Sequence, residues 1–174
     1  MEKTITTVDQ TAGMPSIITQ EAMLAHWQGH RRLTRKVVEV FPDDRLYNYS
    51  IGGMRTFAEL IMEMIDIAGS GIHGIATGKW DKMGWTESNV HTTAPADKKE
   101  LLALWDLITE QIDTFWPQIR PERFQETDKA FGMYEDTVYD LILYFIDNEI
   151  HHRGQGYVYL RSLGIEPPAF YDRS

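Results

Sequence analysis

Apolar residues recur every three to four positions in four stretches of the chain, which is the spacing of one face of an α-helix. Thr19 and Asp97 are residue types preferred at a helix N-cap, and Gly164 is typical of a helix end. No stretch shows the convincing alternation of a β-strand. The pattern therefore predicts an all-α four-helix bundle, with helices over residues 19–41, 55–68, 97–119 and 134–163.

Three segments fall outside this helical pattern. Residues 1–18 show no periodicity and are expected to form an N-terminal arm, which leaves residues 19–174 as the bundle domain. Residues 69–96 are rich in glycine and are long for a bundle connection, so they predict a long crossover between helices two and three. Residues 123–134 fit either an extended turn or a short hairpin around Asp128 and Lys129.

The last predicted helix carries one stripe of side chains that changes from apolar to polar along its length. A buried polar group without a partner costs about 1–3 kcal/mol, so polar residues on an inward stripe indicate a polar site inside the bundle. The stripe consists of Val138, Leu141, Phe145, Asn148, His152, Gln155 and Tyr159.

Glu63 lies in an apolar run of the second predicted helix, while Asn148 and His152 are four residues apart on the last one. If these two helices are neighbours, the three side chains can hold one divalent ion such as Zn, Ni, Fe or Mn. The alternative is a buried hydrogen-bonded trio without a metal. Because the chain has no cysteine, any metal ligands are nitrogen and oxygen atoms.

Other polar residues suggest competing sites. Glu149 and His152 form the Glu-x-x-His element of di-iron bundles, but the chain lacks the second such element that those sites require. Glu149 can instead pair with Arg153 on the same helix. His26 and His30 have metal-binding spacing, but an arginine-rich run follows them directly and opposes a bound cation. His73 and His91 are expected in the crossover as solvent-facing loop residues.

Composition limits the classes of partner. The formal net charge of −9 opposes binding to nucleic-acid phosphates or to an anionic membrane. No apolar run approaches the about 20 residues that span a bilayer, and the first residues lack the regions of a signal peptide. The expected setting is the cytoplasm and the expected partner a small molecule. No catalytic triad, phosphate loop or dinucleotide motif occurs in a fitting context.

Two segments resemble a known family. The run His-His-Arg-Gly-Gln at residues 151–155, with the Leu-Gly and Pro-Pro pairs that follow, is similar to the C-terminal signature of the DinB-like (DNA-damage-inducible) superfamily. Residues 55–63 resemble the second-helix segment of that superfamily. The resemblance implies a four-helix bundle with a long crossover, commonly a homodimer, that holds a metal with three histidines. Those ligand positions fall on Glu63, Asn148 and His152, and only His152 keeps the usual residue.

The resemblance also implies a function, which competes with two other possibilities. Characterised relatives include metal-dependent transferases and isomerases that use low-molecular-weight thiols, in which the metal generates a thiolate. This chain is accordingly expected to be a metal-dependent thiol transferase or isomerase acting on a small molecule. The alternative is a non-catalytic, dimeric, stress-associated bundle that uses its altered metal site as a polar network or ligand pocket. A third possibility is a ferritin-like oxidase, which would require two metals per chain.

Overall fold

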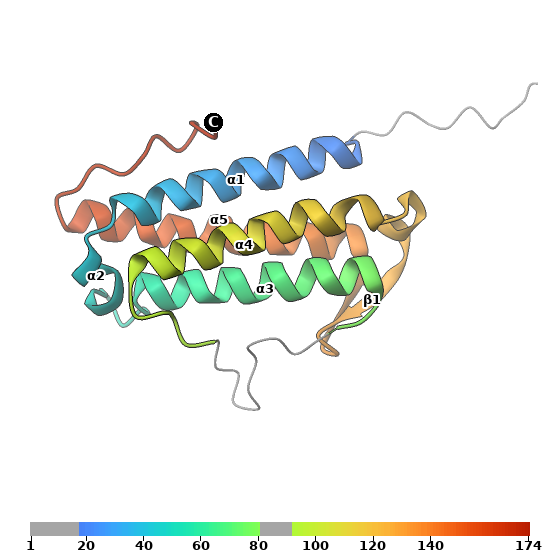
Figure 1. The fold of residues 1–174 in the computed structure, drawn as a ribbon, viewed down its shortest axis with the longest axis horizontal. Helices are drawn as coiled ribbons and strands as arrows, with labels where there is room; N and C mark the ends of the chain where they lie inside the picture. Colours follow the sequence, from blue (N-terminus) through green and yellow to red (C-terminus); the bar gives the residue numbers. More distant parts are fainter. Residues whose placement is uncertain (1–17, 81–91) are drawn as a thin grey trace, which may run out of the picture.

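The computed structural model describes residues 18–80 and 92–174 of the chain. Within these residues the chain folds into helices with one small two-stranded sheet (Figure 1). The α-helices are α1 (Gln20–Val40), α2 (Asp43–Asn48), α3 (Phe57–Thr77), α4 (Lys98–Phe115) and α5 (Val138–Ser162). Short 3₁₀ turns, Trp116–Gln118 and Pro121–Gln125, lead from α4 into the antiparallel hairpin of β1 (Thr127–Ala130) and β2 (Tyr134–Thr137). The structure thus confirms the predicted all-α class.

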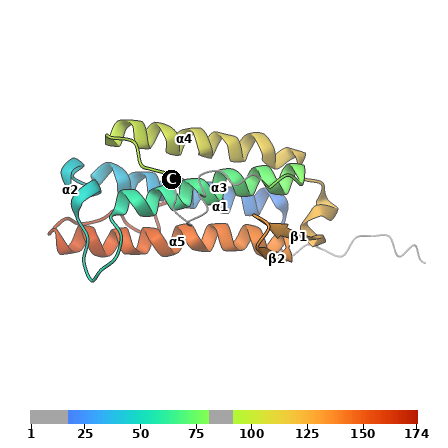
Figure 2. The same ribbon diagram turned by 90° about the horizontal axis from the view of Figure 1, so that it is seen from below.

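The four long helices pack as a bundle in which α1 and α3 each contact both α4 and α5. Figure 2 shows α4 and α5 on opposite sides, with α1 and α3 between them. The colours of Figure 1 show that α3 and α4 run in the same direction and that α1 and α5 run in the other. A connection between two parallel helices must return along the bundle, which explains the length of the chain between Thr77 and Lys98.

Side-chain caps fix where the helices begin. Thr19 accepts a hydrogen bond from the Ala22 amide at the start of α1, and Asp97 accepts one from the Glu100 amide at the start of α4. Thr56 and Glu59 form a reciprocal capping box at α3. These caps satisfy amides that have no partner inside the helix, so local sequence sets the N-termini of α1, α3 and α4.

The core fills the space between the four long helices with aromatic and branched side chains. Trp27 of α1 and Trp105 of α4 are among its largest fully buried members. Phe57 stacks on Phe41 with ring centroids 4.9 Å apart, which closes the bundle at the end where α3 begins. Among residues 18–80 and 92–174, no helix is long and apolar enough to cross a membrane.

The predicted end of the second helix at residue 68 is wrong, because α3 continues to Thr77. Its glycines are places of close packing. A β-carbon on Gly71 would lie 2.5 Å from the Phe145 ring, and one on Gly74 would lie 2.2 Å from the Trp80 ring. Glycine is retained in this helix because the neighbouring rings occupy the space of a side chain. His73 accordingly lies in α3 and not in a loop, whereas His91 lies outside the described residues.

Other boundaries also differ from the prediction. The short helix α2 was not expected, and the third predicted helix changes to a 3₁₀ turn at Trp116, one residue before Pro117. The hairpin is one of the two structures that residues 123–134 predicted, but its turn lies at Phe131 and Gly132. Tyr134 belongs to β2, so α5 begins at Val138, four residues later than expected.

Gly154 and Gly156 of α5 offer a matched pair for testing helix packing. A β-carbon on Gly156 would meet the buried Phe57 ring at 2.5 Å, whereas one on Gly154 would meet nothing within 4 Å. Gly156→Ala is therefore expected to lower the free energy of unfolding by about 1–3 kcal/mol through overpacking. Gly154→Ala is expected to raise it by about 1 kcal/mol through helix propensity. Urea denaturation of both variants checks this, and equal shifts would contradict the packing argument.

Candidate metal centre and the network behind it

The structure brings Glu63, Asn148 and His152 together between α3 and α5. His152 Nε2 lies 3.0 Å from Glu63 Oε1, and Asn148 Nδ2 donates a hydrogen bond to the same oxygen at 3.0 Å. The side chains of Glu63 and His152 are 14% and 7% exposed, so the cluster is largely shielded from solvent. The three residues predicted from the sequence therefore meet at one point.

Arg55, just before α3, completes the cluster from the rim. Its Nη2 atom donates to Glu63 Oε2, so the two oxygens of this carboxylate face different partners. Tyr159 of α5 donates its hydroxyl hydrogen to the Arg55 carbonyl at 2.6 Å, which fixes the backbone of Arg55 against α5. The Arg55 side chain is 43% exposed, so its positive charge remains accessible at the mouth of the site.

Gln155 orients the His152 ring. Gln155 Oε1 lies 2.7 Å from His152 Nδ1, and the Gln155 amide nitrogen donates to Met54 Sδ at 3.5 Å. Because the Gln155 oxygen can only accept, Nδ1 carries a proton. Nε2 then faces the Glu63 carboxylate. A hydrogen bond from Nδ1 that directs Nε2 is the arrangement found around metal-binding histidines.

The donor set fits a divalent ion. His152 Nε2 and Glu63 Oε1 are 3.0 Å apart, which is a hydrogen-bond distance and also brings both atoms close enough to bind the same ion. The Asn148 oxygen, Oδ1, is buried without a hydrogen-bond partner. Rotating the amide by half a turn would direct this oxygen toward the same point. The set comprises a carboxylate, an amide oxygen and an imidazole nitrogen.

The described residues do not assemble a di-iron site. The ranges 18–80 and 92–174 contain no group of three or more His, Asp or Glu side chains placed to hold a metal ion. Glu149 faces α1, away from His152, and Glu59 caps α3. Asp66 accepts two hydrogen bonds from Thr92. Although Glu149 and His152 have the Glu-x-x-His spacing, their side chains therefore lie in different clusters.

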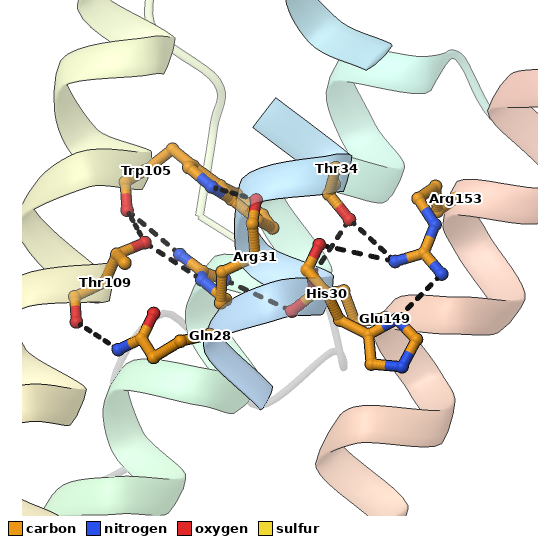
Figure 3. A network of polar contacts seen from close by, with 8 residues as sticks. All are labelled: Gln28, His30, Arg31, Thr34, Trp105, Thr109, Glu149 and Arg153. Carbon is orange, nitrogen blue, oxygen red and sulfur yellow. Dashed lines mark hydrogen bonds and ion pairs between the residues drawn. The ribbon is translucent and has the colours of Figure 1, made fainter. Parts of the chain in front are cut away.

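A second polar cluster lies beside the candidate site, on the face of α5 that is turned toward α1, and Figure 3 shows its residues. Thr34 of α1 donates its hydroxyl hydrogen to Glu149 Oε1 at 2.9 Å and accepts from Arg153 Nη1 at 3.2 Å. Arg31 lies 3.6 Å from Glu149 and donates to Thr109 and to the Trp105 carbonyl of α4. Sequence spacing predicted that Arg153 pairs with Glu149 along α5. Arg153 instead turns toward α1 and donates to Thr34.

This buried network contains two guanidinium groups and one carboxylate. Arg31 is fully buried over the face of Trp105, with its guanidinium carbon 3.3 Å from the ring centroid. Burial lowers the pKa of Arg31 to about 10, while the nearby Glu149 opposes that shift. Burial also raises the pKa of Glu149, and Arg31 opposes this change. The network fixes the rotation of α5 and, through it, the direction of Asn148 and His152.

His26 and His30 form no metal pair. Their rings meet edge to face at 4.6 Å, and Arg153 Nη2 lies 2.9 Å from His30 Nδ1. Burial, together with the charges of Arg153 and Arg173, lowers the pKa of His30 to about 3. His30 is therefore neutral at physiological pH, and its surroundings repel a cation.

His30 makes stability depend on pH. An unfolded histidine binds a proton below about pH 6.5, whereas His30 in the folded chain, with a pKa of about 3, does not. The unfolded state binds more protons in this range, so acidification favours unfolding. His30 should lower the free energy of unfolding by about 1.4 kcal/mol per pH unit below pH 6.5. Urea titrations at pH 7.5 and 5.5 should show a smaller loss for His30→Gln than for the original chain, and equal losses would refute this origin.

Sequence patterns alone do not assign Arg55, Arg31 and Thr34 to these clusters. A signal for the last two was present, because Trp27, Arg31 and Thr34 follow the four-then-three spacing of one helix face. Arg31 lies in an arginine-rich run that indicates a solvated face, yet it is fully buried. The predicted helix begins at Arg55, but α3 begins at Phe57, so Arg55 lies outside the helix and helical spacing does not relate it to Glu63.

Comparisons with known proteins agree with this architecture. The chain is 24% identical over 156 residues to the Bacillus subtilis protein YjoA, an alignment that covers 87% of this chain and 95% of YjoA. The crystal structure of YjoA, described as a DinB-like protein, matches with a TM-score of 0.67 at 23% identity over 86% of this chain and 96% of that chain. A DinB-like protein from Bacillus cereus ATCC 10987 matches with a TM-score of 0.64 at 18% identity, covering 87% and 97% of the two chains. These structures share the fold.

The sequence profile of the DinB family matches residues 10–174, which is nearly the whole chain. The matched region includes the helices that carry Glu63, Asn148 and His152. The chain therefore belongs to the DinB family.

Proposed function

We propose that the chain is a metal-dependent enzyme that transfers or isomerises a small molecule with the help of a low-molecular-weight thiol. Glu63, Asn148 and His152 would hold one divalent transition-metal ion. The observation that carries this proposal is the meeting of a carboxylate, an imidazole and an amide at one largely buried point, with His152 Nε2 and Glu63 Oε1 3.0 Å apart. A bound metal would supply Lewis acidity and favour the thiolate form of a thiol.

The protein groups around this point have distinct roles. Glu63 supplies the negative charge that attracts a cation, and Gln155 keeps the His152 ring in a binding orientation. The half-exposed guanidinium of Arg55 lies at the rim, where its charge would draw an anionic group of a substrate toward the site. An anionic glutamate in place of a neutral histidine makes the metal a weaker Lewis acid, so the chemistry need not copy that of relatives with three histidines.

One observation favours the alternative function of a non-catalytic bundle. Glu63 already receives hydrogen bonds from Arg55 and Asn148 and faces His152, so the carboxylate has the partners of a self-contained polar network. In that case the cluster would stabilise the contact between α3 and α5, or form a small ligand pocket, without a metal.

Metal content distinguishes the two functions. Protein purified without a histidine tag should contain about one equivalent of a transition metal by plasma mass spectrometry. Arg55→Gln removes a cation that competes for Glu63 and should tighten metal binding several-fold. The network alternative predicts no metal in either protein, even after incubation with Zn, Ni, Fe and Mn salts, and a lower melting temperature for Arg55→Gln. Absence of bound metal from both proteins after this incubation would refute the proposed metalloenzyme.

A further inference from the structure

A pocket of about 360 Å³ lies between the β1–β2 hairpin and the beginning of α5, and its lining does not include Glu63, Asn148 or His152. Tyr134 and Tyr144 both line it and stack against each other, with ring centroids 6.4 Å apart and ring planes inclined by 27°. Both tyrosines are half exposed, at 50% and 53%. Phe131 and Phe145 are buried beneath, with centroids 6.2 Å apart. The pocket thus has aromatic walls and an aromatic floor.

The hairpin holds this floor in a strained backbone conformation. Phe131 has a φ of 54°, in the left-handed region that side chains other than glycine rarely adopt. Gly132 follows with a φ of 72°, and the Met133 amide donates to the Ala130 carbonyl at 3.0 Å to close the turn. This conformation places the Phe131 ring against Trp80 and Phe145. Strain of this kind is concentrated at functional sites.

The polar part of the pocket is acidic. Glu135, Asp136 and Asp140 line it, and none of its described lining residues is lysine or arginine. Asp140 accepts a hydrogen bond from the Thr137 hydroxyl at 2.7 Å, and Asp136 accepts one from the Thr137 amide at 2.8 Å. These bonds hold the two carboxylates in place and leave their negative charge intact. Lys129 is the cross-strand partner of Glu135, but it does not line the pocket. The lining therefore combines aromatic faces with carboxylates.

We propose that this pocket binds the positively charged head of a small organic cation, an ammonium group, against the rings of Tyr134 and Tyr144. Aromatic faces attract cations through their quadrupole, and nearby carboxylates add a longer-ranged attraction. A neutral or anionic ligand would gain only the apolar contact. The proposal requires no metal at Glu63 and so stands apart from the proposed enzyme function.

Two probes of the same shape test the role of charge. Choline and its uncharged isostere 3,3-dimethylbutan-1-ol differ at the quaternary centre, where nitrogen replaces carbon. We expect choline to bind the full-length protein at least about fivefold more tightly, in titrations followed by calorimetry and by NMR chemical shifts. The preference for choline should persist after treatment with a chelator. Binding in this pocket can then be judged independently of whether the Glu63 cluster binds a metal.

Variants then locate the binding. Tyr144→Leu should weaken choline binding about three- to fivefold, whereas Tyr144→Phe should retain it because the ring remains. Glu135→Gln should also weaken choline binding and leave the isostere unaffected. Tyr171→Leu serves as a matched control, because Tyr171 is 76% exposed on the C-terminal segment and does not line the pocket. Melting temperatures confirm that each variant is folded.

Equal affinity for the two probes would overturn the proposal, because it would mean that charge is not recognised. Unchanged choline binding in a folded Tyr144→Leu variant would also overturn it, since the cation would then lie elsewhere. A preference for choline that Tyr144→Leu and Glu135→Gln both reduce, and Tyr171→Leu does not, would support it.

Discussion

Replacing Glu149 by alanine is expected to lower the free energy of unfolding by about 3–5 kcal/mol. Glu149 is 2% exposed and is the carboxylate partner of the fully buried Arg31. Its removal leaves the Arg31 and Arg153 guanidiniums buried without a negative charge and deprives the Thr34 hydroxyl of its acceptor. Burying an unpaired charge is far more unfavourable than losing an exposed ion pair. Urea denaturation at neutral pH measures the change.

Glu166→Ala provides the matched control for this experiment. Glu166 pairs with Arg161 through two hydrogen bonds of 3.0 Å, but both side chains are largely exposed. Its loss should change the free energy of unfolding by about 0–1 kcal/mol. Similar losses for Glu149→Ala and Glu166→Ala would show that the buried network does not hold α5 against α1 and α4.

The two clusters show what helical spacing can predict. Spacing places Asn148 and His152 on one face of a helix, and Glu63 stands out as an acid within an apolar run. The candidate metal residues can therefore be identified from the sequence. Spacing does not reveal which helices are neighbours or how each one rotates. Glu149 and His152 are three residues apart and suggested a shared site, yet Glu149 contacts α1 while His152 faces α3.

The extent of α3 shows why the remaining boundaries were missed. Glycine lowers helix propensity, so a run with Gly69, Gly71 and Gly74 predicted a loop on local grounds. Tertiary packing reverses that preference, because the rings of Phe145 and Trp80 leave no space for a β-carbon. Those rings come from distant segments, and a single sequence does not show which ring will meet which glycine.

Loss of one residue of the proposed metal centre is the second large effect that we expect. His152→Ala and Glu63→Ala should each weaken binding of a divalent transition metal by at least about 100-fold, because even residues that only orient a ligand contribute 10–100-fold. Both variants should remain folded, since the buried network of Thr34, Glu149 and Arg153 involves neither residue. Competition with a metal-binding dye measures the affinity, and circular dichroism checks the fold. His151→Ala is the matched control, because this neighbouring histidine is exposed.

Asn148 separates a metal site from a hydrogen-bond network most sharply. Asn148→Asp replaces the amide that donates to Glu63 with a second carboxylate. In a network this substitution sets two negative groups against each other, so stability should fall. Around a divalent ion the added charge strengthens binding, so metal affinity should rise and the metal should restore stability in proportion to its concentration. A destabilised Asn148→Asp variant that added metal fails to rescue would exclude Glu63, Asn148 and His152 as a metal centre.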